Sequence, residues 1–117
     1  MSKQSIGRES EQKACDYLRR RGYKIIAQNY RSKCGEIDII AEFNGELVFV
    51  EVKSRHSAAY GFPAEAVNYR KQQKIIRTAM CYLMQSGRLD RHCRFDVIEV
   101  FLDGDYQVNH IVNAFET

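Results

Sequence analysis

Residues 35–55, GEIDIIAEFNGELVFVEVKSR, decide the fold of this chain. Two runs rich in Ile, Val and Phe flank the dipeptide Asn44-Gly45. Asn-Gly between such runs is a strong signal for a two-residue type I′ turn, which requires positive φ at both central residues. The segment is therefore predicted to form an antiparallel β-hairpin in which Phe43 pairs with Glu46.

The register of the predicted hairpin follows by counting outward from the turn. Ile39 is then expected opposite Val50, and Asp38 opposite Glu51. Because side chains alternate between the two faces of a strand, Asp38, Glu51 and Lys53 are predicted to share one face. A bulge or a longer loop would separate Asp38 from Glu51, since a shift of one residue moves a side chain to the other face.

Two opposed carboxylates on nearly continuous apolar strands are unfavourable unless they are protonated, paired with a cation or bound to a metal ion. Mg²⁺ typically takes one or two carboxylates together with waters and substrate phosphate. The Asp38–Glu51 pair and the ammonium group of Lys53 are therefore suited to phosphodiester cleavage. The structural alternative is a cross-strand ion pair between Glu36 and Lys53, with Asp38 and Glu51 at a wet sheet edge.

The composition is that of an ordinary globular protein. The 117 residues are 44% hydrophobic and 28% charged, and they predict one domain over residues 1–117. The formal net charge of +3 permits nucleic-acid binding without requiring it. The N-terminal residues contain no apolar signal segment, and no apolar run is long enough to span a bilayer. We therefore expect a cytoplasmic protein without a membrane partner.

The cysteines carry no metal-binding or disulfide pattern. There are four of them, widely spaced and without a C-x-x-C motif, at Cys15, Cys34, Cys81 and Cys93. Such spacing argues against a zinc site and against a disulfide framework of the kind found in small secreted proteins. The sequence therefore predicts buried thiols that stay reduced in a cytosol.

The rest of the chain alternates helical and extended patterns. We predict helices over 5–21 and 63–86, and strands over 23–31, 94–102 and 106–115 in addition to the hairpin. The order α-β-β-β-α-β-β predicts an α/β fold, in which a three-stranded meander is followed by a crossover helix and a parallel fourth strand. Helices should flank this mixed central sheet. The core stripe that we predict for the second helix is Tyr69, Ile76, Met80 and Leu83.

Spacing leaves two interpretations open for several charged residues. Glu11 adjoins the apolar stripe of the first helix, so it is either a solvated edge residue or a third acid aimed inward. Arg70, Lys74 and Arg77 recur at i, i+4 and i+7 on the second helix. This basic stripe is either a solvated face or a contact to nucleic-acid phosphates.

Two other charged positions are interpreted as structural. The run Arg19–Arg21 closes the last turn of the first helix, where positive charge interacts favourably with the carboxyl end of the helix dipole. Asp96 lies near the start of its strand, and we expect it to stabilise the fold rather than to act on a ligand.

Seven short motifs occur in order along the chain. They are GRESE at 7–11, AQNYR at 27–31, GEIDIIA at 35–41, VFVEVKSR at 48–55, YGFPAEAV at 60–67, RFDV at 94–97 and NAF at 113–115. Together they are similar to the YraN family of small bacterial proteins, which are often labelled as endonucleases. The Asp on one hairpin strand and the E-x-K on the next resemble the PD-(D/E)XK nuclease superfamily. The resemblance implies a restriction-endonuclease-like fold, similar to that of archaeal Holliday-junction resolvases.

The resemblance also implies an activity and a set of site residues. A member of this superfamily would be a Mg²⁺- or Mn²⁺-dependent endonuclease acting on DNA. Asp38 and Glu51 would be the metal ligands, the main-chain carbonyl of Val52 would be a further ligand, and Lys53 would be the catalytic lysine. Glu11 matches the acidic residue of the family's first helix.

The expected partner is nucleic acid, with DNA as the first choice. The predicted contacts are Arg31, Arg55, Arg70, Lys71 and Lys74. Resolvase-like enzymes often act as dimers because two strands must be cut, so a homodimer is an expectation that no residue of the sequence fixes. Ser10 departs from the family pattern, which commonly has glycine there. The alternative function is a non-catalytic module that binds nucleic acid or a protein partner and keeps the nuclease fold.

Overall fold

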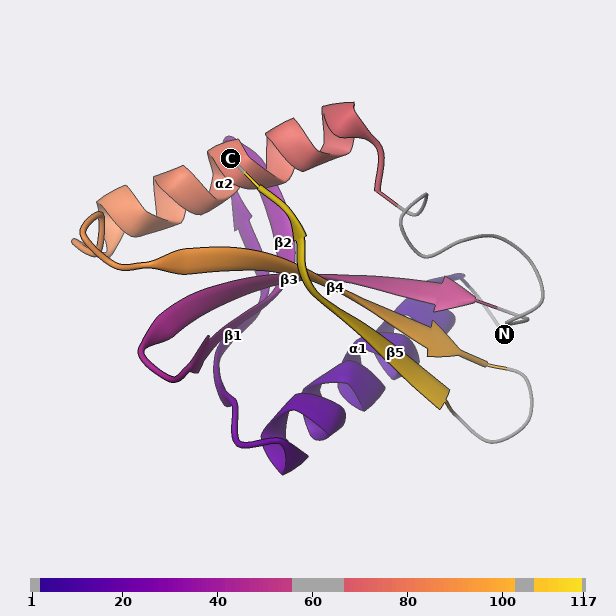
Figure 1. The fold of residues 1–117 in the computed structure, drawn as a ribbon. Coiled ribbons are helices and arrows are strands. Elements are labelled where there is room, and N and C mark those ends of the chain that lie inside the picture. The colour runs from indigo at the N-terminus through magenta and orange to yellow at the C-terminus, as the bar shows by residue number, and fades with distance from the viewer. Residues whose placement is uncertain (1–2, 56–66, 103–106, 117) are drawn as a thin grey trace.

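The structure, a computed structural model, describes residues 3–55, 67–102 and 107–116, and the side chains of residues 3–6 lie outside this description (Figure 1). Within these ranges the elements are α1 (Lys3–Arg20), β1 (Lys24–Ser32), β2 (Gly35–Phe43), β3 (Glu46–Arg55), α2 (Tyr69–Gln85), β4 (Cys93–Phe101) and β5 (Gln107–Phe115). The predicted α/β class and the order α-β-β-β-α-β-β are confirmed. Neither helix among the described residues is long and apolar enough to cross a membrane.

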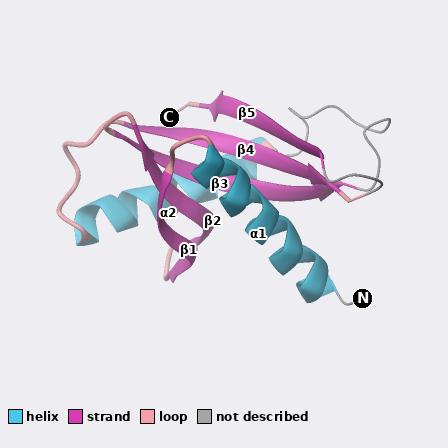
Figure 2. Cartoon of the chain, turned by 90° about the horizontal axis from the view of Figure 1, so that it is seen from below, coloured by secondary structure: helices cyan, strands magenta, loops and turns pink. Residues whose placement is uncertain are grey.

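The described strands form one mixed sheet in the order β1-β2-β3-β4-β5. The pairs β1–β2, β2–β3 and β4–β5 are antiparallel, and β4 runs parallel to β3. A parallel neighbour requires a crossover, which α2 provides. The two helices cover opposite faces of the sheet, with α2 on one side and α1 on the other (Figures 1 and 2). The predicted meander, crossover and flanking helices are therefore confirmed.

The hairpin of β2 and β3 has the predicted turn. Asn44 and Gly45 both have positive φ, at 50° and 82°. The register runs from Phe43–Glu46 to Ile39–Val50, as predicted. It ends there in the described strands, so the expected main-chain pairs of Asp38 with Glu51 and of Glu36 with Lys53 do not form. The two strands separate beyond Ile39, and this separation opens one end of the hairpin.

The side chains of the hairpin alternate between the two faces of the sheet, and this divides the core into two layers. On the α2 side, Ile40 and Phe49 are buried together with residues of the helix. On the α1 side, Ile39 and Val48 pack with Leu18. All five of these side chains are at most 1% exposed. The two central strands are thus buried on both faces, which explains why they are nearly continuous apolar runs.

The start of α2 differs from the prediction. The helix begins at Tyr69 rather than at residue 63, which lies outside the described residues. Asn68 caps it in an extended conformation, and its side-chain oxygen accepts a hydrogen bond of 2.9 Å from the main-chain N–H of Lys71. Asparagine is among the most favourable residues at this capping position. The helix therefore starts where its first main-chain donors are satisfied.

The buried face of α2 also differs from the predicted stripe. Tyr69 is 74% exposed and Met80 is 45% exposed, so both are wrongly predicted as core residues. The buried row is Ile75, Ala79 and Leu83, at spacings of four residues. Residues four apart lie on one side of a helix. The helix presents this row to the sheet, Ile76 and Tyr82 pack partly buried beside it, and Tyr69, Met80 and Met84 face outward.

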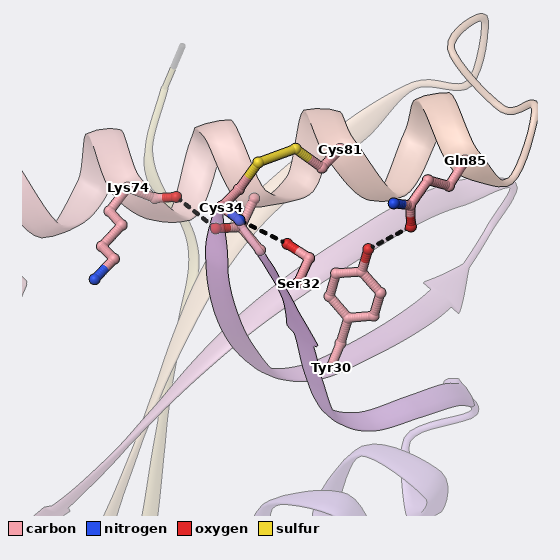
Figure 3. The surroundings of a disulfide bond; sticks show 7 residues. Tyr30, Ser32, Cys34, Lys74, Cys81 and Gln85 are labelled. Carbon is pink, nitrogen blue, oxygen red and sulfur yellow. Dashed lines mark hydrogen bonds between the residues drawn. A yellow bond between two sulfur atoms is a disulfide. The ribbon is translucent and has the colours of Figure 1, made fainter.

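A disulfide between Cys34 and Cys81 joins the β1–β2 turn to α2 (Figure 3). The prediction of reduced thiols is therefore wrong for this pair. The two cysteines are 47 positions apart in the sequence, and only the packing of the turn against the helix brings them together. Cys15 and Cys93 are free thiols, as predicted; Cys15 is buried and Cys93 is half-buried.

The turn beside the disulfide has no room for a side chain at Gly35. Its φ of +146° is a conformation that residues with a Cβ atom rarely adopt. A Cβ atom there would lie 2.7 Å from Oγ1 of Thr78 and 3.3 Å from Cε of Lys74. At the same junction the Tyr30 hydroxyl donates a 2.9 Å hydrogen bond to Oε1 of Gln85 (Figure 3). The turn therefore lies directly on the helix.

We expect Gly35→Ala to lower the free energy of unfolding by about 1–3 kcal/mol, because the new methyl group meets Thr78 and the backbone is strained. Urea unfolding of the oxidised protein measures this loss. Gly7→Ala is the control, since its Cβ would have no neighbour within 4 Å. A helical Gly→Ala change should be neutral or stabilise the protein by up to about 1 kcal/mol. Equal stability of the Gly35 variant and the wild type would contradict the close packing.

Candidate functional site

The acidic residues singled out in the sequence meet in a pocket of about 360 Å³ at the open end of the hairpin. Its floor comes from β2 and β3, and one wall comes from the first two turns of α2. The lining residues are Glu36, Asp38, Glu51, Asn68, Arg70, Lys71, Lys74 and Ile75. Asp38 and Glu51 therefore share a pocket, as predicted, although their main chains are not paired there.

Asp38 is fixed by a main-chain hydrogen bond from the next strand. Its Oδ2 accepts a bond of 2.8 Å from the N–H of Val52. Burial and the negative charge of Glu51 together raise the pKa of Asp38 to about 7, against the lowering effect of the Val52 bond. Near neutral pH this carboxyl group therefore sits close to its midpoint of protonation.

Glu51 is buried and bound by two lysines. Its side chain is 9% exposed, and its Oε1 lies 2.8 Å from Nζ of Lys71 and 3.7 Å from Nζ of Lys53. Burial, followed by the neighbouring Lys71, lowers the pKa of Lys53. Burial is the largest single effect on Lys71 and acts to lower its pKa, but the hydrogen bonds to Glu51 and Lys53 and the charges of Glu51 and Asp38 together raise the net pKa. Lys71 therefore holds its proton, and with it its positive charge, more strongly than Lys53 does.

Glu11 turns inward, which decides between the two interpretations of its position. Its Oε1 is buried and has no hydrogen-bond partner among the described residues. Burial raises its pKa, and the charges of Glu36 and Glu51 raise it further. The preceding Ser10 is also buried, and its hydroxyl lies 2.5 Å from that of Ser54 at the end of β3. This serine pair holds the first half of α1 beside the acidic site.

The predicted nucleic-acid contacts divide into two groups. Arg70, Lys71 and Lys74 line the pocket together, on the first turns of α2. Arg31 is exposed and lies 3.4 Å from the carboxylate of Glu36, at the rim of the pocket. Arg55 does not join them, because its Nε donates a 3.1 Å hydrogen bond to the buried carboxylate of Glu99.

The donor set fits a weakly chelated divalent cation better than a closed structural site. No group of three or more His, Cys, Asp and Glu side chains in the described parts of the chain is arranged to hold a metal ion. Mg²⁺ needs fewer, because it usually keeps several waters and takes one or two carboxylates. The raised pKa of Asp38 and the orphaned oxygen of Glu11 mark uncompensated negative charge that a cation would neutralise. The carbonyl of Val52 stays a predicted ligand.

Sequence reasoning missed the bond between Lys71 and Glu51. Lys71 was expected to contact nucleic acid, not to neutralise a carboxylate of the site. It lies in the first turn of the crossover helix, and this turn packs beside Glu51, which is near the middle of β3. That placement is a usable signal, but it requires the true start of α2, and the predicted start was too early. The cross-strand pair between Glu36 and Lys53 is not formed in the described structure, where Lys53 approaches Glu51 instead.

The raised pKa of Asp38 predicts a specific dependence of stability on pH. The ordinary pKa of 3.8 applies to the unfolded chain, and the folded value is about 7. Between these values the folded state binds more protons, so stability falls as the pH rises from 5 to 8. Asp38→Asn removes this titration. Between pH 5 and pH 8 the free energy of unfolding of the variant should therefore fall by roughly 1–3 kcal/mol less than that of the wild type.

Urea unfolding at pH 5 and pH 8 measures the effect of Asp38→Asn. Asp90→Asn, at an exposed turn position before β4, is the matched control and should keep the wild-type dependence on pH. An identical change of stability with pH in the wild type and in Asp38→Asn would contradict the raised pKa.

Comparison with known proteins identifies a family. The model described as "Uncharacterised protein family UPF0102" matches residues 10–100, which include all the acids of the pocket. A UPF0102 protein of Alkaliphilus oremlandii is 51% identical over 113 residues, covering 94% of this chain and 97% of that protein. A UPF0102 protein of Caldanaerobacter subterraneus subsp. tengcongensis is 44% identical over 119 residues, covering 98% of each. One from Persephonella marina is 46% identical over 110 residues, covering 94% and 92%. The chain therefore belongs to the UPF0102 family, in agreement with its YraN-like motifs.

Proposed function

We propose that this protein is a metal-dependent phosphodiester hydrolase that acts on DNA. The observation that carries the proposal is the confinement of Asp38 and Glu51 in one pocket with Lys71, while Nζ of Lys53 lies 3.7 Å from Oε1 of Glu51. Two carboxylates beside basic side chains are the parts that phosphodiester cleavage needs. The resemblance of the D…E-x-K pattern to PD-(D/E)XK nucleases supports the same reaction.

The acids of the site and the neighbouring Lys53 have distinct roles in this proposal. Asp38 and Glu51 would hold Mg²⁺ or Mn²⁺, together with the carbonyl of Val52. The bound metal would supply Lewis-acid stabilisation of the phosphate and a more acidic water. Lys53, whose ammonium group is 3.7 Å from Glu51 and whose pKa is lowered, would orient the water or stabilise developing charge. Glu11 would add negative charge beside the pair.

DNA would enter along the basic wall formed by α2. Arg70, Lys71 and Lys74 lie on this wall, and such side chains position a phosphate backbone without reading its sequence. Lys71 bonds Glu51 at 2.8 Å in the structure. If Glu51 held a cation, the ammonium group of Lys71 would be free to contact a DNA phosphate. Substrate and metal would in this way favour each other's binding.

We expect cleavage of at least one DNA structure in Mg²⁺ or Mn²⁺ and its loss in Lys53→Met. Removing one preorganised charge from a catalytic site costs about 10²–10³ in rate. Linear, nicked, flap and four-way DNA, each incubated with either metal, would measure the activity. Lys24→Met, on the exposed surface of β1, controls for the lost charge and should cleave like the wild type. Cleavage that persists in Lys53→Met would show that the proposed site is not responsible.

A second candidate function is a nucleic-acid-binding module that does not cleave. The observation in its favour is that Lys71 and Lys53 already neutralise Glu51 without a metal. Such a module would bind DNA in a salt-dependent way through the basic wall of α2. Its acids would then set the position of the lysines and take no part in a reaction.

Calorimetric titration with Mn²⁺ separates the two functions. If the protein is a hydrolase, the wild type should bind Mn²⁺. Asp38→Asn should then bind Mn²⁺ at least about tenfold more weakly, because substitutions around a metal site commonly cost that much affinity. The non-cleaving module predicts no Mn²⁺ binding in either protein, and DNA binding that survives Glu51→Gln. Equal Mn²⁺ affinity of the wild type and Asp38→Asn would place the cation elsewhere.

A further inference from the structure

A second and larger pocket, of about 690 Å³, opens on the α1 face of the sheet. It lies beyond the last turn of α1, which packs mainly on β1 to β4 and leaves the outer strand β5 less covered. The lining residues are Tyr17, Arg20, Arg21, Tyr23, Phe43, His110 and Val112. None of the described acids of the proposed hydrolase site lines it. The two pockets are therefore separate, and they are associated with different helices.

The floor of this pocket is a fixed chain of hydrogen bonds. Asp96 is fully buried, and its Oδ2 lies 2.7 Å from Nε2 of His110. A carboxylate can only accept, so Nε2 carries a proton, and in neutral His110 the Nδ1 atom accepts from the Tyr17 hydroxyl at 3.2 Å. Arg94 and the main-chain N–H of Asn113 also donate to Asp96. The orientations of Tyr17 and His110 are set by this buried acid.

The predicted structural role of Asp96 is thus supported by its contacts. Burial acts to raise the pKa of Asp96, but the hydrogen bonds from His110 and Arg94 outweigh burial and lower it. The carboxylate stays charged inside the protein because every bond to it comes from a donor. Such a network gives the pocket a rigid polar floor without leaving an acidic group on its surface.

The walls combine aromatic rings with guanidinium groups. Tyr23 and Phe43 stack with ring centroids 4.1 Å apart and planes 11° from parallel. The guanidinium group of Arg21 lies 4.8 Å from the centroid of the Tyr17 ring. Arg20 and Arg21 are exposed at the rim. Aromatic side chains beside basic ones are the usual means of binding unpaired bases and their phosphates.

The run Arg19–Arg21 has a simpler explanation as charge at a helix C-terminus. That explanation accounts for Arg19, which pairs with Asp16 at 3.8 Å on the surface of the helix. It does not explain why the other two arginines line a pocket whose other lining residues, apart from Val112, have aromatic rings. The position of Arg20 and Arg21 in this pocket therefore calls for an explanation other than the helix dipole.

We propose that this second pocket binds a nucleoside phosphate unit, either as a free nucleotide or as part of a single strand. The base would lie against the rings of Tyr17 and Phe43, and the phosphate would contact Arg20 and Arg21. When His110 is neutral, the Tyr17 hydroxyl donates inward to its Nδ1 atom and keeps its lone pairs for a donor group of the base. The proposal does not depend on hydrolysis, because it uses none of the residues of the Asp38–Glu51 pocket.

The test uses a fluorescently labelled single-stranded deoxythymidine oligomer of about ten nucleotides, a typical length for such sites. Binding is measured by anisotropy in a chelator, so that no metal takes part. The double variant Arg20→Gln/Arg21→Gln should bind at least about tenfold more weakly. Its slope of log affinity against log salt should be smaller by about 1.4, since single strands lose roughly 0.7 per phosphate contact. Arg8→Gln/Arg19→Gln removes the same charge from the same helix and should retain most of the affinity.

NMR signals of the His110 ring report on the pocket itself, and a His110→Gln variant assigns them. Thymidine monophosphate should shift these signals at a concentration about tenfold lower than inorganic phosphate does. Saturation by the free nucleotide identifies a nucleotide site, and shifts caused only by the oligomer identify a single-strand site; both support the proposal. Three results would overturn the proposal. They are shifts of the His110 signals by inorganic phosphate at the same concentration as by thymidine monophosphate, His110 signals that no ligand shifts, and an equal loss of affinity for the oligomer in the two double variants. Asp38→Asn should bind the oligomer and the nucleotide like the wild type. The result of this test can therefore be interpreted even if the hydrolase proposal fails.

Discussion

The hydrogen bond from the N–H of Val52 to the carboxylate of Asp38 is the contact on which the proposed site depends. The strand pairing of the hairpin stops at Ile39–Val50, so the main chain beyond it needs other partners. The Asp38 side chain supplies one of them and is thereby held at the mouth of the hairpin. Glu51, one residue before Val52, is brought to the same place. The end of the pairing between β2 and β3 thus creates the pocket and also positions Asp38 in it.

The electrostatics of the pocket follow from this confinement. Buried carboxylates that lie close together repel each other and lose hydration, and both effects oppose their charged forms. Two lysines offset part of this cost at Glu51, whereas Asp38 keeps a raised pKa and one oxygen of Glu11 has no hydrogen-bond partner within residues 3–55, 67–102 and 107–116. Groups perturbed in this way by burial and by neighbouring charges cluster at functional sites, and this supports the proposed role of the pocket.

Much of the fold could be predicted because local signals and the global fold agree. Asn44-Gly45 fixes the turn, the turn fixes the register, and the register brings Asp38 and Glu51 to one pocket. What could not be predicted depends on tertiary packing. The end of the strand pairing at Ile39 leaves no mark in the sequence pattern.

The rotation of α2 about its axis and the contacts of its residues also could not be predicted from the sequence. An apolar stripe defined by Tyr69 and Met80 was as good a candidate for the core as the row that is buried, and only contact with the sheet decides between them. The Cys34–Cys81 disulfide depends on the docking of a turn against a helix that follows it far along the chain. The same docking also explains why residue 35 is glycine.

The most direct test of the shared acidic site is a pH titration of the Asp38 side-chain carboxyl, followed by carbon NMR. In the metal-free protein the carboxyl should titrate near the pKa of about 7. Glu51→Gln should move this pKa back toward the ordinary value of 3.8, because it removes the neighbouring negative charge. A carboxyl that titrates near 3.8 in both proteins would show that the two acids do not share a confined pocket.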